Sequence, residues 1–289
     1  MSRIVSISSF ELRNNAESFR SLGKLHHDLS VYEDENIEID CTKLSWFDAH
    51  LSGPLRTIIN HSKQNNNFHK LTNVRADIRD ILSKNGLLKR KLHDTFGTTM
   101  PVRSFGLDMG RDFAAYAKKN LSRPEMPKMT SQLQRKFHEG IDEIFANCSL
   151  HSDSPIDIIA AGQIYPRKHL LTISISDGGI GIIGSLRKAG IPIRNHSEAI
   201  NWAMQKNNTS RRGDIPGGLG LAVLQEFISK NSGKLHIASK RGYWCQNGNE
   251  IVTRKLDYEF PGTCVIIEIN SADKKSYDFK APVSKDDVW

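Results

Sequence analysis

Apolar and polar residues alternate along the first hundred positions in a pattern that predicts a small α/β layer. Strand-like segments have apolar residues at every second position, whereas helical segments have them on one face. The segments follow one another as strand, helix, strand, helix, strand, helix, at 4–9, 14–30, 37–44, 46–61, 68–74 and 75–84. Asn85-Gly86 ends the last helix with a stop signal. This alternation is typical of a sheet covered by helices.

The pattern weakens between residues 95 and 129, where prolines interrupt it and one helix is predicted at about 109–120. The segment P-E-M-P-K-M-T-S then leads into a helix N-cap at Thr130 or Ser131. The last residues are polar and charged without a sustained period, which predicts a mobile tail. We therefore expect four parts, namely a first domain at 1–100, a connector with a short helix at 101–129, a second domain at 130–270 and the tail at 271–289.

The second domain opens with an amphipathic helix, S-Q-L-Q-R-K-F-H-E-G-I-D-E-I-F-A-N-C. Glu143 and Asn147 are four residues apart in it and therefore project from one face. A carboxylate beside a carboxamide oxygen suits Mg²⁺ together with a water or hydroxyl that awaits deprotonation. This helix is thus a candidate for metal-assisted chemistry.

A buried strand with alternating Leu171, Ile173 and Ile175 runs directly into the sequence D-G-G-I-G at 177–181. A strand that ends in this way brings the Asp177 carboxylate to the sheet edge, beside glycine backbone that a flat ligand can approach closely. A carboxylate in that position can accept a hydrogen bond from an exocyclic amine such as that of adenine.

A glycine-rich stretch, P-G-G-L-G at 216–220, leads into an apolar helix that stops near Asn231-Ser232-Gly233. Free backbone N–H groups and the positive helix end favour an anion such as phosphate there. Two antiparallel strands are predicted after it, K-L-H-I-A-S and then P-G-T-C-V-I-I-E-I, with Thr263 at the start of the second.

The order of these four pieces resembles the GHKL, or Bergerat-fold, ATPase superfamily between about 130 and 270. The resemblance implies a two-layer α+β sandwich that binds ATP and Mg²⁺. It makes Glu143 the general base or a water-polarising carboxylate, Asn147 the Mg²⁺ ligand and Asp177 the adenine anchor. It also implies ligand contacts from a further set, namely Gly179 and Gly181 at the base and ribose, Gly217, Gly218, Leu219 and Gly220 at the phosphates, and Thr263 through water on the adenine side.

By the same resemblance, residues 182–216 form an ATP lid. The lid candidates are Thr209, Ser210, Arg211 and Arg212. The two arginines are candidate clamps for the transition state, and an exposed basic loop is the alternative.

The first domain resembles, more loosely, a STAS domain, in which a strand ends before a D-S-x-G helix start. Here the corresponding sequence is D-A-H-L-S-G, so Ala49 and His50 occupy the place of the serine and Ser52 lies slightly beyond it. We therefore expect a STAS-like module kept for docking or dimerisation rather than for phosphorylation.

Composition and charge limit the classes of partner that the sequence suggests. The net charge is +8 and the pI is near 9.3, which raises a weakly supported nucleic-acid hypothesis because no nucleic-acid-binding motif accompanies the basic residues. No apolar run is long enough to span a bilayer, and the N-terminus lacks the apolar segment of a secretory signal. The four cysteines are scattered without metal spacing, which is typical of a reducing cytoplasm.

Three classes of function follow. A regulatory ATPase or protein kinase is favoured, with its nucleotide state read by a protein partner, a second copy or the STAS-like module. A non-hydrolysing ATP switch is the first alternative. A DNA-associated ATPase is less expected, because only about 20 residues follow the last predicted strand. His138 shares a helix with Glu143 and is expected to be an ordinary surface residue rather than a phosphoacceptor.

Overall fold

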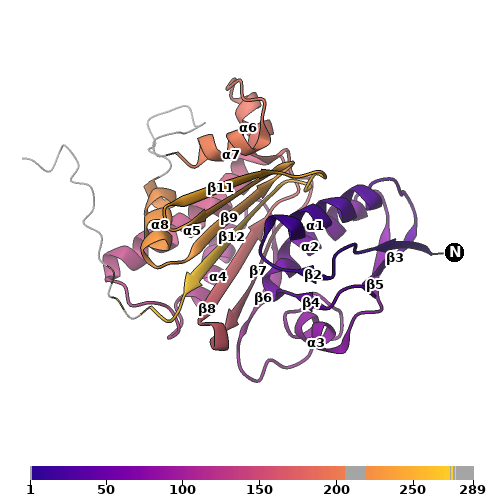
Figure 1. Ribbon diagram of the computed structural model, residues 1–289, viewed down its shortest axis with the longest axis horizontal. Coiled ribbons are helices and arrows are strands. Elements are labelled where there is room, and N and C mark those ends of the chain that lie inside the picture. Colours follow the sequence, from indigo (N-terminus) through magenta and orange to yellow (C-terminus); the bar gives the residue numbers. More distant parts are fainter. Residues whose placement is uncertain (1, 206–218, 274, 276, 278–289) are drawn as a thin grey trace, which may run out of the picture.

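A seven-stranded sheet forms the centre of the computed structural model, which describes residues 2–205, 219–273, 275 and 277, without the side chains of 219 and 220 (Figure 1). Every neighbouring pair in it is antiparallel. The strands, in spatial order, are β11 (Glu250–Lys255), β10 (Gly242–Asn247), β9 (Lys234–Ser239), β12 (Thr263–Asn270), β8 (Leu170–Ser176), β7 (Ile158–Tyr165) and β6 (Thr99–Phe105).

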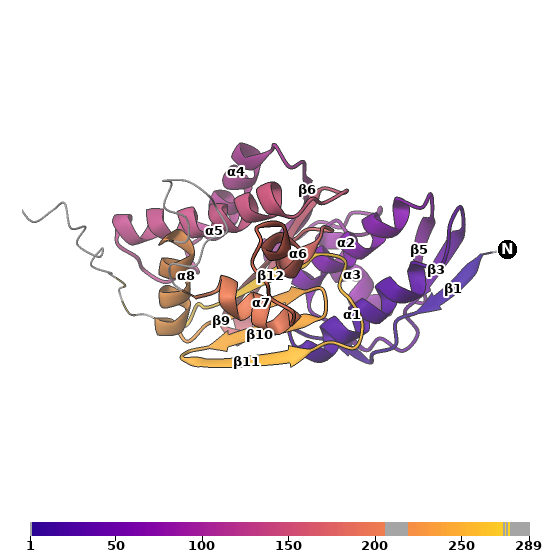
Figure 2. The ribbon, with the colours of Figure 1, turned by 90° about the horizontal axis from the view of Figure 1, so that it is seen from above.

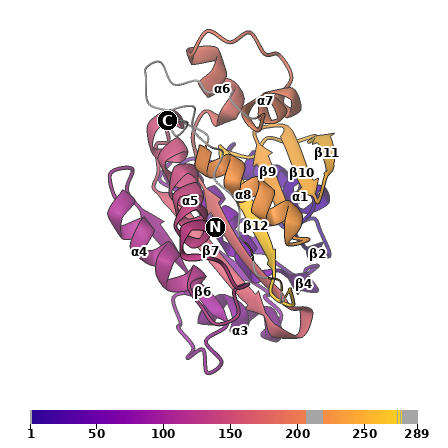
Figure 3. The ribbon, with the colours of Figure 1, turned by 90° about the vertical axis from the view of Figure 1, so that its left-hand side faces the viewer.

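One face of this sheet is covered by α4 (Gly110–Leu121), α5 (Ser131–His151) and α8 (Leu219–Lys230), as Figure 3 shows. Thr130 caps α5 by accepting from the Leu133 N–H, as its sequence predicts. The Phe113 ring of α4 stacks on Phe145 of α5 at 4.5 Å between centroids. Helices α6 (Gly181–Lys188) and α7 (His196–Ala203) pack against each other and, seen from above, lie near the centre of the molecule with α8 to their left (Figure 2).

The opposite face is covered by the N-terminal module, residues 2–98. Its strands β1 (Arg3–Ser6), β3 (Asn36–Asp40) and β5 (Phe68–Thr72) form a parallel sheet in the order β1-β3-β5. Its helices are α1 (Ala16–Leu29), the short η1 (Ala49–Leu51), α2 (Ser52–Lys63) and α3 (Ala76–Lys84). One hydrophobic core joins this module to the large sheet, and the rings of Phe19 and Phe260 meet within it at 5.9 Å.

Buried polar contacts fix α2 on β8. Ser174 Oγ donates to the His50 carbonyl at 2.6 Å, and the hydroxyls of Thr57 and Ser176 are also 2.6 Å apart. A Cβ on Gly53 would lie 2.5 Å from Ser174 Oγ, so only glycine allows this close approach. The polar side chains of β8 therefore lie beneath the N-terminal module and not in solvent.

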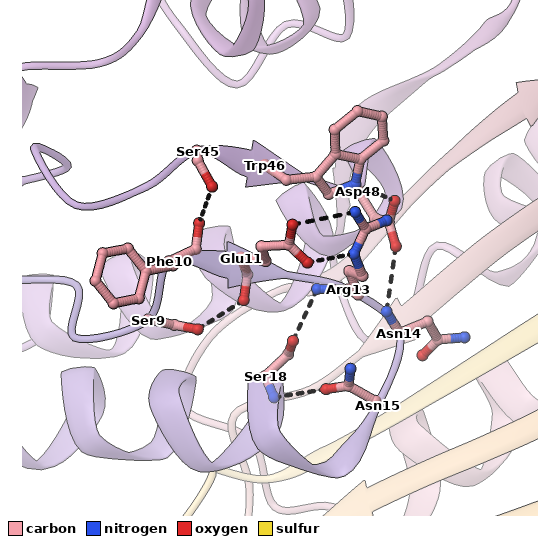
Figure 4. Close-up of polar contacts among 10 residues, drawn as sticks. All are labelled: Ser9, Phe10, Glu11, Arg13, Asn14, Asn15, Ser18, Ser45, Trp46 and Asp48. Carbon is pink, nitrogen blue, oxygen red and sulfur yellow. Dashed lines mark hydrogen bonds and ion pairs between the residues drawn. The ribbon is translucent and has the colours of Figure 1, made fainter.

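A second link runs through two short parallel strands, β2 (Glu11–Leu12) and β4 (Trp46–Phe47) (Figure 4). Asp48, directly after β4, accepts from the Asn14 N–H at 3.2 Å and from Trp46 Nε1 at 2.9 Å. The Asn14 side chain then donates to Glu268 Oε1 of β12 at 2.7 Å. The turn before α1 is thus attached directly to the central sheet.

The order of strands and helices predicted in the first hundred residues is confirmed, as are α4, α5, β8, α8, and the antiparallel pair β9 and β12. The helix expected at 46–61 begins only at Ser52, because β4 and η1 occupy the first part of that range. One further expectation needs correction. The connector at 101–129 contains most of β6, which hydrogen-bonds to β7 as an edge strand of the large sheet. The helices of the first hundred residues share a hydrophobic core with that sheet.

The tail at 271–289 lies mostly outside the described residues. Its Tyr277 is buried, against Phe227 at 5.3 Å between ring centroids, and bridges to Met129. This residue therefore departs from the expectation of a mobile tail. No helix in the described part of the chain is long and apolar enough to cross a membrane.

Candidate functional site

A pocket with a cavity volume of about 160 Å³ and an open mouth lies between α5, the end of β8, the helices α6 and α7, and the start of α8. Five residues predicted from the sequence line it together, namely Glu143, Asn147, Asp177, Gly181 and Thr263. They come from segments separated by as many as 120 residues, so the fold gathers what the sequence motifs indicate separately.

The α5 wall of the pocket presents Glu143, Asn147 and His151 at successive helical turns. The Leu221 N–H, in the first turn of α8, donates to Glu143 Oε2 at 3.1 Å. A helix N-terminus attracts negative charge through its unpaired N–H groups and its dipole. The carboxylate therefore lies at the edge of a region suited to anions.

Asp177 lies at the closed end of the pocket and is only 1% exposed. Its Oδ1 accepts from the Gly179 N–H at 2.9 Å and from the Thr263 N–H at 3.3 Å. Burial raises the pKa of this carboxyl to about 6, although these hydrogen bonds and the Cys148 thiol counteract the rise. The side chain is thus a rigidly held acceptor that is ionised at neutral pH and protonated in mild acid.

Two glycines allow this arrangement. A Cβ on Gly262 would lie 2.2 Å from the Asp177 carbonyl oxygen and 2.6 Å from Oδ1. A Cβ on Gly179 would lie 1.9 Å from the Ser152 carbonyl oxygen, and Gly179 packs there instead of lining the pocket. Both positions therefore need glycine for close packing around the carboxyl.

Gly181 begins α6 with a positive φ of 70°, a conformation that glycine adopts without strain. The next N–H, of Ile182, donates to Ser239 Oγ at 2.9 Å, and Ser239 Oγ is 3.0 Å from Thr263 Oγ1. The turn that carries Asp177 is thereby attached to β9 and β12.

The remaining walls are mostly apolar. Leu235, Ile237 and Val265 contribute from the sheet, and Trp202 and Met204 from α7 and its C-cap. An apolar slot with a buried acceptor at its end suits a flat heteroaromatic ring that carries an amine. The α7 contribution was not predicted, although Asn195, which caps α7 by accepting from Ser197 and Glu198, was a usable signal.

Several predicted contacts lie outside the described residues, namely Gly217, Gly218, Thr209, Ser210, Arg211 and Arg212. Leu219 and Gly220 begin α8, beside the pocket residue Leu221. No lysine or arginine occurs among the described residues of the pocket wall.

The donor set fits Mg²⁺ held jointly with a ligand. Within the described ranges, no group of three His, Cys, Asp or Glu residues could hold a metal ion alone. The Asn147 amide and Glu143 carboxylate both line the pocket. Mg²⁺ commonly takes one or two protein oxygens and completes its shell with phosphate and water.

His138 lies one turn before Asp142 on α5 and contacts Ser122 Oγ through Nε2 at 3.2 Å, away from the pocket wall. Ser52, near the expected STAS phosphoacceptor place, is fully buried and accepts from Asn85 Nδ2 at 2.7 Å. Both side chains are therefore engaged in hydrogen bonds outside the pocket wall.

Comparison with known proteins adds no identification. No model of a known protein family matches this chain, and a search of curated proteins also finds no match.

Proposed function

We propose that this chain binds ATP with Mg²⁺ and acts as a GHKL-type regulatory ATPase or protein kinase. The observation that carries the proposal is the convergence of Glu143, Asn147, Asp177 and Thr263 on one pocket. A helix layer on an antiparallel sheet also supports a Bergerat-type fold for residues 99–270. The four unpaired cysteines support a cytoplasmic setting.

In this proposal the Asp177 carboxylate accepts from the exocyclic amine of adenine, and the apolar walls enclose the ring. Thr263 keeps the carboxylate in place through its N–H. Asn147 holds Mg²⁺, which neutralises phosphate charge when it is bound. Glu143 orients and deprotonates the attacking water or hydroxyl.

The N-terminal module supplies the readout. It resembles a STAS domain in its three parallel strands and alternating helices, but Ala49 and His50 are buried against the large sheet. We therefore propose that it senses nucleotide state through packing and not through a phosphorylated side chain. A protein partner or a second copy would then recognise its outer surface.

Incubation with ATP labelled at the γ-phosphate tests the activity, alone and with candidate protein partners. Free phosphate would identify an ATPase, and labelled protein a kinase. Glu143→Gln should abolish either product, whereas Asp142→Asn, a neighbouring change on α5 outside the pocket wall, should not. Absence of ATP binding by the wild type would overturn the proposal.

A non-hydrolysing switch is the second candidate. It is favoured by the hydrogen bond from Leu221 to Glu143, because this contact gives the carboxylate a structural role in closing α5 onto α8. ATP binding without release or transfer of the label, under all partner conditions, would select this candidate. Nucleic-acid-stimulated turnover would instead select the DNA-associated alternative.

A further inference from the structure

Lys240 occupies an unusual backbone position in the turn between β9 and β10. Its φ is 52°, in the left-handed region that favours glycine and asparagine. The other described non-glycine residues with positive φ are Asp, Asn, His or Ser, so Lys240 alone among them has a long aliphatic side chain. A strained backbone conformation persists only where surrounding contacts hold it, so the contacts of Lys240 matter.

Lys240 touches both segments that shape the Asp177 site. Its side chain runs beside Gly181, where a Cβ would lie 2.7 Å from Lys240 Cγ. Its N–H donates to the Gly262 carbonyl at 3.0 Å, and its own carbonyl accepts from Phe260 at 3.1 Å. The same residue therefore braces the start of α6 and the segment before β12.

The ammonium group of Lys240 pairs with a carboxylate in the segment between β11 and β12. Lys240 Nζ is 3.5 Å from Glu259 Oε1, and the side chain is only 18% exposed. His26 of α1 and His61 of α2 lie in its field, as does His196 of α7. Burial lowers the pKa of all three imidazoles, and the Lys240 charge lowers them further.

His61 completes the connection to the ligand turn. A Cβ on Gly178 would lie 3.4 Å from His61 Cδ2, which is ordinary contact distance. The His61 ring also meets the His26 ring edge-on at 4.9 Å. The turn at 177–181 thus lies near His61 of α2 and beside Lys240 in the β9–β10 turn.

We propose that Lys240 is a positioning residue that holds the turn at 177–181 in its ligand-binding arrangement and couples that turn to helices α1 and α2 of the N-terminal module. The inference rests on the proposed function, since it names the route by which the module senses and regulates the same pocket. The Lys240 charge adds to the hydrogen bonds that favour the ionised Asp177, and the neighbouring rings of His61 and His26 would carry a shift of the turn to α2 and α1.

Several neighbouring groups shift the pKa of the Asp177 carboxyl. Burial raises the pKa of Asp177, whereas the Gly179 and Thr263 N–H groups, the Cys148 thiol and the Lys240 charge lower it. Cys264 is a further buried thiol in its field, and the nearby pocket wall also contains Glu143 and His151. Removing the cation should therefore raise the pKa of Asp177, and replacing it with another cation should not.

The experiment measures ATP-Mg affinity by calorimetry between pH 5 and 8 for wild type, Lys240→Met and Lys240→Arg. Lys136→Met, which removes an ion-paired lysine on the exposed side of α5, is the matched control. Lys240→Met should bind several-fold more weakly at pH 6.5, with its acid limb moved to higher pH, and Lys240→Arg should restore both. Wild-type affinity and an unmoved limb in Lys240→Met would overturn the inference.

Carboxyl and histidine NMR separates this inference from the proposed function. In the ligand-free protein, Lys240→Met should raise the pKa of Asp177 whether or not ATP is the ligand, and an unchanged value would refute the electrostatic role. If the wild type binds no ATP, the proposed function fails, but the pKa of Asp177 in the ligand-free protein still tests the role of Lys240.

ATP should shift the His26 and His61 signals in wild type but much less in Lys240→Met, and equal shifts would refute the coupling. If Lys240→Met does not fold, the same measurements are made on Glu259→Gln, which keeps the Lys240 cation but removes its ion-pair partner.

Discussion

The Leu221 N–H donates to the Glu143 carboxylate at 3.1 Å, so the end of the pocket where we propose the chemistry is also where α5 meets α8. A ligand phosphate that approached the first turn of α8 would compete with Glu143 for these N–H groups. Binding would then release the carboxylate from a structural contact and make it available to a water or hydroxyl. The same side chain can thereby respond to occupancy and carry out chemistry.

Glu143→Gln tests this double role. The amide still accepts from Leu221 but is no longer a base, so ATP affinity should change less than about three-fold while turnover falls by about 10²–10⁴-fold. Calorimetry and phosphate release measure the two quantities separately. Loss of binding in step with turnover would instead mean that Glu143 mainly supports the pocket.

Asp177→Asn should abolish measurable ATP binding while the protein stays folded. The carboxamide can present an N–H to the adenine amine and loses the charge that strengthens the hydrogen bond. Because burial raises the pKa of Asp177 to about 6, wild-type affinity should also fall as the pH drops through that value. The pH profile and circular dichroism of the variant provide the measurements, and equal binding by wild type and variant would show that Asp177 is not the anchor.

Gly262→Ala should damage the site without any change of charge. Its Cβ would meet the Asp177 carbonyl at 2.2 Å and the Gly179 nitrogen at 2.7 Å, so backbone must move. We expect a loss of about 1–3 kcal/mol in unfolding free energy and at least about ten-fold in ATP affinity. Gly110→Ala is the matched control, because the nearest atom to its Cβ is a ring carbon of Phe145 at 3.8 Å. Similar behaviour of the two variants in urea unfolding and binding would contradict this explanation.

Local periodicity was sufficient for elements with one apolar and one polar face. It placed α5 and β8, and the motifs at Glu143 and Asp177 indicated residues that the fold brings into one pocket. It missed β7, whose A-A-G-Q centre combines small and polar residues on a strand that is buried on both faces. It also missed β10 and β11, whose partners are set by a hairpin and not by an apolar period.

The packing of the N-terminal module on the large sheet could not be predicted from the sequence of either domain alone. Thr172, Ser174 and Ser176 alternate with apolar residues, and such a pattern ordinarily indicates a solvent-facing side. In the structure these hydroxyls are buried beneath α2 and η1, where they hydrogen-bond to His50 and Thr57. The partner surface lies more than a hundred residues earlier in the chain, so no local pattern identifies it.

Glu268 provides a test of that long-range interface. Burial alone would raise the pKa of this carboxyl, but the neighbouring His236 and the Asn14 donor outweigh it and lower the pKa to about 2. His236 Nε2 is 3.7 Å from Glu268 Oε1 across the sheet. The carboxylate therefore stabilises both the sheet and the turn before α1.

The sign of the pH dependence follows from the lowered folded-state pKa. The contribution of Glu268 is fully present above its unfolded-state pKa of 4.5 and is lost as the pH falls through about 2. Glu268→Gln should lower the unfolding free energy at pH 7 by about 3 kcal/mol, whereas wild type and variant should converge near pH 2. Urea unfolding at pH 7, 4 and 2.5 measures this difference, and Glu226→Gln, which removes an exposed partner of Lys230 on α8, is the control that should cost less than about 1 kcal/mol. A constant difference between wild type and Glu268→Gln across this range would mean that packing, and not the charge on Glu268, holds the N-terminal module to the sheet.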